Sequence, residues 1–177
     1  MIRCYVTDRH QGDVLACARR AIQNKVDMIQ VREKDLDARE LFKLVYTIRD
    51  FAAGTPTRIL VNDRLDVALA TGVDGIHLPS NGLPINRVRR FVKHLGVSTH
   101  TVEEALDAEK AGADFIIFGP IFDAPGKTPI GLGPLKKVSI AVRIPVLAIG
   151  GITAANSAEV VKSGGAGIAG IRLFQSD

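Results

Sequence analysis

The sequence predicts an α/β fold, a compact (β/α)8 barrel whose last helix is missing or reduced. Three observations lead to this prediction. Eight short runs of apolar and β-branched residues recur along the 177 residues, segments with helical periodicity lie between them, and the loops are short throughout. Such alternation is typical of a parallel sheet covered by helices. Eight units favour closure into a barrel over an open, flavodoxin-like sheet, which remains the alternative.

The eight expected strands are nearly continuous in apolar residues, as parallel strands buried on both faces are. In chain order they are residues 3–7, 28–32, 58–62, 75–78, 96–99, 115–119, 145–150 and 167–171. An acidic residue opens the strand that follows a helix stop at Asp74 and again at Asp114. These recurring features indicate repeated strand–helix units.

The expected helices carry start and stop signals. Asp37, with an acid three residues later, predicts a capping box, and Thr101 precedes two acids that suit a helix N-terminus. Gly112 and Gly164 have the position of glycines that end helices. We therefore expect seven helices between the eight strands.

The length of the chain bears on its domain organisation. Each unit takes about 22 residues, which is compact, since this barrel usually has roughly 200 residues or more. The sequence reaches Asp177 just after the eighth strand, so the eighth helix is expected to be missing or reduced to a stub. One flank of the barrel would then be uncovered, and a homodimer contact there, or a loss of stability, is expected. Residues 1–177 are expected to form a single domain because no linker interrupts the pattern.

Composition excludes several classes of protein. With 46% hydrophobic and 24% charged residues, the chain is expected to be globular, and it has no apolar run of the roughly 18 to 20 residues that cross a membrane. The start lacks a secretory signal, and two cysteines imply no disulfide framework, so the cytoplasm is the expected compartment. The sequence has no Cys/His cluster with the spacing of a zinc site, so a structural zinc ion is not expected. A net charge of +4 with 5% aromatic residues argues against nucleic acid and leaves small anions as the better ligands.

Polar residues gather where the expected strands end, and in barrels of this kind the active site lies at those carboxyl ends. Buried charges there are costly without a partner, so a polar ligand is expected. The alternative is that they cap helices and form salt bridges, which we favour for Asp8, His77 and His100 taken singly. The polar positions are Thr7-Asp8, Gln30-Val31-Arg32-Glu33-Lys34, Asn62-Asp63-Arg64, His77, Ser98-Thr99-His100, Gly119-Pro120, Gly150-Gly151 and Arg172.

The segment after the second strand gives the strongest single signal. Strand alternation places Gln30 and Arg32 on one face, with Lys34 beyond the strand end on the same side. Three donors, two of them cationic, suit a phosphate or pyrophosphate. Glu33, on the other face, is expected to anchor to a neighbouring strand or helix. A purely structural Arg–Glu pair is the less favoured alternative.

Two further segments suit anionic ligands and their counterions. Asp63, after Asn62, is a candidate Mg²⁺ ligand, and capping of the next helix is an equally good interpretation. Gly150 and Gly151, before a helix in the seventh unit, allow backbone N–H groups to approach a phosphate, and Arg172 could add a charge there.

A Gly/Pro-rich loop follows the sixth strand on the same side of the barrel. It covers residues 122–133 and carries one cation, Lys127. A mobile lid is one interpretation, and a plain connector is the other.

Taken together, these segments resemble the thiamine-phosphate synthase and thiazole tautomerase superfamily over nearly the whole chain. No single motif would identify the family, but their order is highly specific. The motifs are Gln30-Val31-Arg32-Glu33-Lys34, Val61-Asn62-Asp63-Arg64, Asp74-Gly75-Ile76-His77-Leu78, Gly96-Val97-Ser98-Thr99-His100-Thr101, Phe118-Gly119-Pro120-Ile121-Phe122 and Ala148-Ile149-Gly150-Gly151-Ile152.

The resemblance implies a transferase of thiamine biosynthesis. Members of the synthase branch join 4-amino-5-hydroxymethyl-2-methylpyrimidine pyrophosphate to thiazole phosphate with Mg²⁺, and pyrophosphate leaves first. By the resemblance, Gln30, Arg32 and Lys34 would hold the pyrophosphate, Asn62 would support it, and Asp63 would bind Mg²⁺.

The resemblance also assigns the remaining positions. Ser98 would contact the pyrimidine or its pyrophosphate, and Lys127 would neutralise the leaving group, so that Arg32, Lys34 and Lys127 are the expected catalytic groups. Gly150-Gly151 would bind the thiazole phosphate. Ile171-Arg172 stand where synthases have small phosphate-binding residues after strand eight.

The chain departs from the synthase pattern at further positions. Pro79-Ser80-Asn81-Gly82 replace a Gly-Gln-x-Asp whose acid is the second Mg²⁺ ligand, and Ala124-Pro125-Gly126 replace a Thr-x-Thr in the lid. The first of these stretches is more similar to the tautomerase branch, which often has a His directly after the glycine of strand six. Here that residue is Pro120, as in the synthases. Three functions therefore stay open: the transferase, a metal-independent thiazole tautomerase, and a non-catalytic barrel that binds thiazole or thiamine phosphate.

Overall fold

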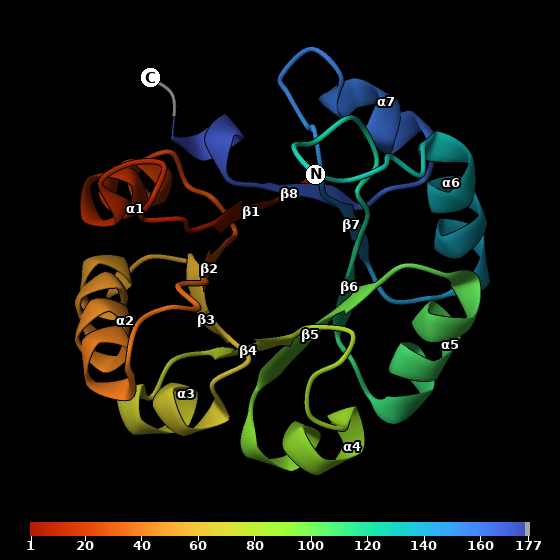
Figure 1. Cartoon of the computed structure of the whole chain (residues 1–177). Coiled ribbons are helices and arrows are strands. Elements are labelled where there is room, and N and C mark those ends of the chain that lie inside the picture. The colour runs from red at the N-terminus through yellow and green to blue at the C-terminus, as the bar shows by residue number, and fades with distance from the viewer. Residues whose placement is uncertain (176–177) are drawn as a thin grey trace.

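The computed structural model describes residues 1–175 and shows eight parallel strands closed into one barrel (Figure 1). Each strand pairs with the next in sequence, and the last pairs with the first. The barrel prediction is confirmed, and the open-sheet alternative is excluded. The strands are β1 (Ile2–Val6), β2 (Met28–Val31), β3 (Arg58–Asn62), β4 (Gly75–Leu78), β5 (His94–Thr99), β6 (Phe115–Phe118), β7 (Val146–Ala148) and β8 (Gly167–Gly170).

Seven α-helices form the outer ring of the barrel (Figure 1). They are α1 (Val14–Gln23), α2 (Ala38–Ala52), α3 (Leu65–Thr71), α4 (Ile85–Val88), α5 (Val102–Ala111), α6 (Leu132–Ala141) and α7 (Ser157–Lys162). Two 3-10 helices follow α4 and β8, namely η1 (Arg89–Phe91) and η2 (Arg172–Phe174). Within the described residues, η2 is all the helix that follows β8, as the prediction of a reduced last helix requires. None of the helices between residues 1 and 175 combines the length and apolar character of a membrane span.

The predicted helix ends are found in the structure. Asp37 forms a capping box with Glu40 at the start of α2, and the Thr101 side chain accepts from the backbone N–H of the third helical residue of α5. Gly112 ends α5 with a left-handed φ of 100°, a conformation that favours glycine. Local sequence signals therefore determine where these helices begin and end.

Acidic residues at the amino end of the barrel bind the backbone of the neighbouring strand. Each acid directly precedes an even-numbered strand. Its carboxylate accepts a hydrogen bond from a backbone N–H near the start of the preceding strand, a donor that would otherwise lack a partner. The pairs are Asp27 with the N–H of Arg3 (2.7 Å), Asp74 with that of Ile59 (2.9 Å) and Asp114 with that of Leu95 (2.7 Å). The recurrence of Asp74 and Asp114 in the sequence thus reflects strand registration.

The inward face of the strands changes character along the barrel axis. At the amino end it is an apolar cluster that contains Met28 and Leu60. Two residues further along the same strands, the inward positions are polar, Gln30 on β2 and Asn62 on β3. The barrel is thus closed by a packed core at one end and opens into a polar cavity at the other.

We predict that Asp74→Ala lowers the free energy of unfolding by about 1–3 kcal/mol, because it leaves the N–H of Ile59 without its acceptor. Urea denaturation followed by circular dichroism measures the change. Asp50→Ala is the control: its carboxylate is half exposed and, among residues 1–175, pairs with Arg49 alone on the surface, so a change within about 0.5 kcal/mol is expected. Equal losses in the two variants would contradict the proposed role of Asp74.

Candidate active site

A cavity of about 790 Å³ lies at the carboxyl end of the barrel, a volume in the range of small-molecule sites. It is lined by inward residues of the strands and by the loops that follow them. The lining contains all but one of the residues that the sequence analysis gave a catalytic, substrate-binding or metal role: Gln30, Arg32, Lys34, Asn62, Ser98, Lys127, Gly150, Gly151, Ile171 and Arg172. Asp63 is the exception.

A hydrogen-bonded network forms the floor of this cavity. The Gln30 amide nitrogen donates to Asn62 Oδ1 at 2.9 Å and to His77 Nδ1 at 2.8 Å. The other ring nitrogen of His77, Nε2, lies 3.5 Å from Ser98 Oγ. Gln30, Asn62 and His77 are all buried. Four side chains from four consecutive strands, β2 to β5, therefore form one connected polar layer.

His77 is neutral in this network. Burial, together with the positive charge of Arg32, lowers its pKa to about 3. An amide nitrogen only donates, so Nδ1 of His77 accepts and the ring proton is on Nε2. His77 thus presents a donor toward Ser98.

Arg32 and Lys34 form a cationic rim above this floor. A contact between β1 and the end of β2 holds this rim in place. The Thr7 hydroxyl donates to Glu33 Oε1 at 2.5 Å and accepts from the backbone N–H of Arg32 at 3.0 Å. Glu33 is buried, and its second oxygen accepts from the backbone of Arg9 at 3.1 Å. Glu33 thus anchors to the neighbouring strand, as expected. The alternative, a structural ion pair between Arg32 and Glu33, does not form. Among the described residues, neither Arg32 nor Lys34 has an ion-pair partner.

The two glycines after β7 allow a close backbone crossing. Gly150 and Gly151 have φ values of 96° and 62°. A Cβ atom on Gly150 would lie 2.4 Å from the Cβ of Pro120, and one on Gly151 would lie 2.4 Å from the carbonyl oxygen of Asp123. Within residues 1–175, the N–H groups of both glycines donate to no backbone oxygen. The glycines thus serve loop packing and leave donors for an anion.

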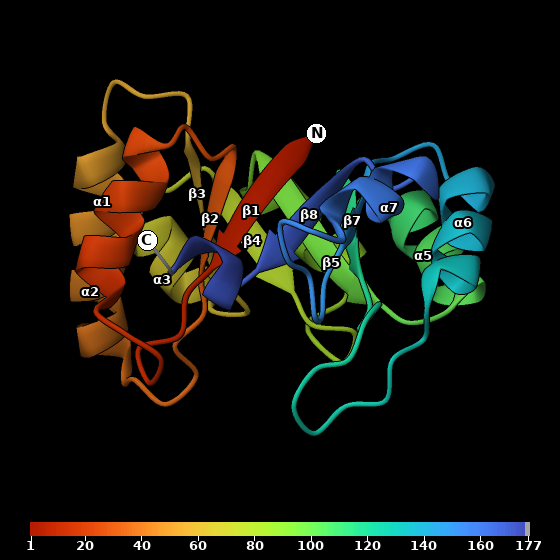
Figure 2. The same ribbon diagram turned by 90° about the horizontal axis from the view of Figure 1, so that it is seen from above.

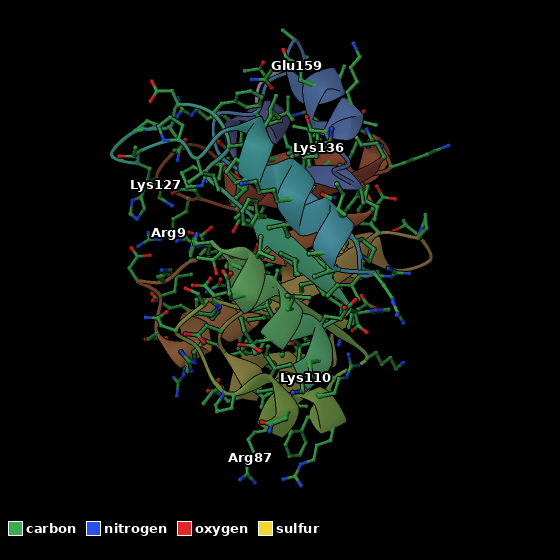
Figure 3. All side chains as sticks on the ribbon, turned by 90° about the vertical axis from the view of Figure 1, so that its right-hand side faces the viewer. Arg9, Arg87, Lys110, Lys127, Lys136 and Glu159 are labelled. Atoms are coloured by element: carbon green, nitrogen blue, oxygen red, sulfur yellow. The ribbon has the colours of Figure 1, made fainter. Side chains whose placement is uncertain are left out.

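The loop between β6 and α6 projects beyond the carboxyl ends of the strands (Figure 2). Its base is closed by hydrogen bonds from the N–H of Ile130 to Pro120 O (2.8 Å) and from Gly131 to Ile121 O (3.0 Å). Lys127 lies at the edge of the molecule where Arg9 also lies, the edge of the cavity mouth (Figure 3). The loop therefore brings a cation to the cavity. This position is compatible with both interpretations of the loop, a mobile lid and a plain connector.

Sequence reasoning named His77 and His100 as polar strand-end residues but favoured a structural role for each, and it gave Asp123 no role; all three line the cavity. His100 donates from Nδ1 to the carbonyl oxygen of Gly119 at 2.9 Å, so its Nε2 carries a lone pair. Asp123 lies in the loop beside Lys127, and an acid in a loop already expected at the site was the available signal. The structural interpretation does hold for Asp8, which accepts from the backbone N–H of His10 at 3.0 Å.

Asp63 follows β3 in a left-handed conformation, with φ of 63°, which is uncommon for a residue other than glycine. Its side chain does not cap α3: the N-cap residue is Arg64, which forms no side-chain cap bond. Asp63 is exposed, and no hydrogen bond to its carboxylate is found in residues 1–175. That part of the chain contains no group of three or more His, Cys, Asp or Glu residues placed to hold a metal ion. The metal-ligand role of Asp63 stays a prediction.

Known proteins are similar to this chain over nearly its full length. The family model of thiamine monophosphate synthase matches residues 4–174. Thiamine-phosphate synthase of Methanocella arvoryzae is 44% identical over 166 residues, which cover 90% of this chain and 78% of the relative. The corresponding enzyme of Roseiflexus castenholzii is 40% identical over 176 residues, 93% of this chain and 76% of the relative.

A solved structure agrees with these relatives. Thiamine phosphate pyrophosphorylase from Pyrococcus furiosus superimposes with a TM-score of 0.92 at 35% identity, covering 99% of this chain and 88% of that chain. Fold, cavity and sequence similarity thus point the same way. The chain belongs to the thiamine monophosphate synthase family.

Proposed function

We propose that this chain is a transferase that joins 4-amino-5-hydroxymethyl-2-methylpyrimidine pyrophosphate to thiazole phosphate, giving thiamine phosphate and pyrophosphate. The observation that carries the proposal is the gathering of Arg32, Lys34 and Lys127 at one cavity, where no carboxylate pairs with them among the described residues. Cations without partners at a cavity favour a multiply charged anion. The family of the chain supplies the substrates that fit.

The reaction requires departure of an anion more than it requires proton transfer. The bond between the pyrimidine methylene carbon and the pyrophosphate oxygen breaks, and the electron pair leaves with pyrophosphate. The thiazole nitrogen then donates its lone pair to the methylene carbon and forms the new C–N bond. Arg32, Lys34 and Lys127 stabilise the charge that develops on the leaving group, the main contribution that fixed cations make to such a step. Gln30, Asn62 and Ser98 orient the pyrimidine and its pyrophosphate.

The thiazole phosphate fits the side of the cavity at the ends of β7 and β8. The free N–H groups of Gly150 and Gly151 provide backbone donors of the kind that bind phosphate. Ile171 and Arg172, after β8, line the same cavity, and Arg172 adds a positive charge. Separate anion sites on the two sides would keep the two substrates in the orientation for attack.

Mg²⁺ is the metal ion that we propose for this reaction. It is typically held by one or two carboxylates together with substrate phosphates and waters, so a large cluster of ligands is not required. Asp63, whose carboxylate is exposed at the end of β3 and accepts no hydrogen bond within residues 1–175, and Asp123, in the cavity lining, have the donor chemistry for it. Bound there, Mg²⁺ would help neutralise the pyrophosphate.

A second candidate function is supported by His100. A thiazole tautomerase needs a base to move a proton, and Nε2 of His100 offers a lone pair beside Gly119, next to the position where that branch often has its histidine. This reaction would need neither the pyrimidine substrate nor a metal. A third possibility is a barrel that binds thiazole or thiamine phosphate without turnover.

Two assays, one for released pyrophosphate and one for conversion of the thiazole substrate, distinguish these functions. Purified protein is incubated with both substrates, with Mg²⁺ or with EDTA, and released pyrophosphate is measured by a coupled assay. We expect release that depends on both substrates and on Mg²⁺. Turnover of the thiazole substrate alone in EDTA would instead identify the tautomerase. A ligand-induced rise in Tm with no turnover in either assay would identify a binding protein.

The metal site is tested by Asp63→Asn and Asp123→Asn, each of which removes a charge while keeping the size of the side chain. We expect Asp63→Asn to lose pyrophosphate release at ordinary Mg²⁺ concentrations and to regain part of it at high Mg²⁺, because weaker metal binding is the defect. Asp123→Asn should raise the Mg²⁺ requirement if it is the second carboxylate. An unchanged Mg²⁺ titration in both variants would exclude these residues as ligands.

We also propose that the chain forms a single domain, acts as a homodimer and works in the cytoplasm. The reduced last helix supports the homodimer: the three residues of η2 stand in place of a full helix beside β8, next to a hollow of about 370 Å³ whose lining includes Arg3, Ile168 and Phe174. Both cysteines are free thiols, which suits a reducing compartment. Light scattering should give about twice the 19.0 kDa of one chain, and a monomer mass at all concentrations would contradict the homodimer.

A further inference from the structure

We infer that His77 is a positioning residue of the active site, one that sets the direction of the hydrogen bonds offered by Gln30 and Ser98. The inference rests on the proposed function for the identity of the ligand but on geometry alone for the direction of the bonds. His77 lies on β4 between these two side chains and is 3% exposed. Both of its ring nitrogens face a neighbour in the floor of the cavity.

The first consequence concerns the amides. Both hydrogens of the Gln30 amide are engaged, one with His77 Nδ1 and one with Asn62 Oδ1. The Gln30 oxygen is thus the atom that remains for a ligand, and on Asn62 it is the amide nitrogen. The floor offers one acceptor and one donor at defined places.

The second consequence concerns Ser98. The Nε2–H of His77 faces Ser98 Oγ across 3.5 Å, a long contact of the kind that tightens when a ligand binds. An oxygen that accepts from the ring keeps its own proton for another acceptor. Ser98 is therefore oriented to donate to the substrate.

A change in the protonation of His77 would reverse this arrangement. A proton on Nδ1 would face the Gln30 amide nitrogen, and that amide would have to rotate, offering N–H groups to the cavity in place of oxygen. The opposite orientation would also break the bond from Gln30 to Asn62. One buried ring thus determines which donors and acceptors a substrate meets.

The surroundings of His77 favour the neutral ring in a fixed orientation. The ring is buried beside Phe115, with centroids 6.4 Å apart, and the space above Gly96 on the adjacent strand is filled by that phenyl ring. Arg32 is the charged group that acts on it, and its positive charge opposes protonation. Packing and charge therefore support the same state.

The state of the ring can be measured without any substrate. In protein labelled with ¹⁵N-histidine at pH 8, we expect the His77 signals of a ring with the proton on Nε2 and the lone pair on Nδ1. A proton on Nδ1 would overturn the inference. The result stands whether or not the chain releases pyrophosphate, so it separates a failure of this inference from a failure of the proposed function.

The effect on catalysis is tested by a double-mutant cycle. His77→Phe keeps the ring shape and removes both nitrogens, and Ser98→Ala removes the hydroxyl. We expect each to lower kcat/KM for pyrophosphate release by roughly ten- to a hundredfold, because the substrate is misplaced. If His77 acts through Ser98, the double variant loses clearly less than the product of the two losses. Two losses that multiply fully would contradict a positioning role through Ser98.

Two further variants separate positioning from folding. His77→Asn restores an acceptor where Nδ1 stands, so it should recover part of kcat/KM relative to His77→Phe. Ile76→Val, on the same strand but facing the other side, should lower Tm and leave kcat/KM unchanged. If His77→Asn is no better than His77→Phe while both match Ile76→Val in Tm, the role of His77 is not to position Gln30.

Discussion

The active site depends on one constraint: a polar side chain that points into a barrel of this size must find a partner, because it is cut off from water. Along β2 and β3 the inward residue changes from apolar to polar within two positions, and the polar ones are satisfied by one another across strands. The network of Gln30, Asn62 and His77 is thus the boundary between core and cavity. Below it the barrel is packed, and above it groups remain free for a ligand.

The two ends of the barrel differ in whether their polar and charged groups find partners within the protein. At the amino end, acids such as Asp74 bind the first free N–H of the neighbouring strand, and the edge is closed. At the carboxyl end, Glu33 holds β1 to the end of β2 through Thr7, and Arg32 and Lys34 remain without carboxylate partners in the described part of the chain. Charge is therefore internally compensated where the fold needs rigidity and uncompensated where an anion is to bind.

The sequence predicted the strands, the helix caps and the cationic cavity because these depend on local signals. Period-two alternation shows that Gln30 and Arg32 share a face, and Asp37 with Glu40 three residues later defines a cap whatever surrounds it. What it did not predict depends on neighbours across strands. The roles of His77 and His100 follow from the register that brings them to Gln30 and to the Gly119 carbonyl, and no spacing within one segment contains that information.

Asp63 shows how the same limit applies to function. Capping and metal binding were equally good interpretations of an acid that precedes a helix; the structure shows no cap bond at α3, and metal binding stays a prediction. A backbone conformation that is unfavourable for most residues persists where the surrounding structure enforces it, often at functional sites. The N–H of Asp63 donates to the carbonyl oxygen of His77 at 2.9 Å, so the strand that positions the floor of the cavity also fixes the turn that carries this carboxylate. The candidate metal ligand and the network in the floor of the cavity are therefore joined directly by a backbone hydrogen bond.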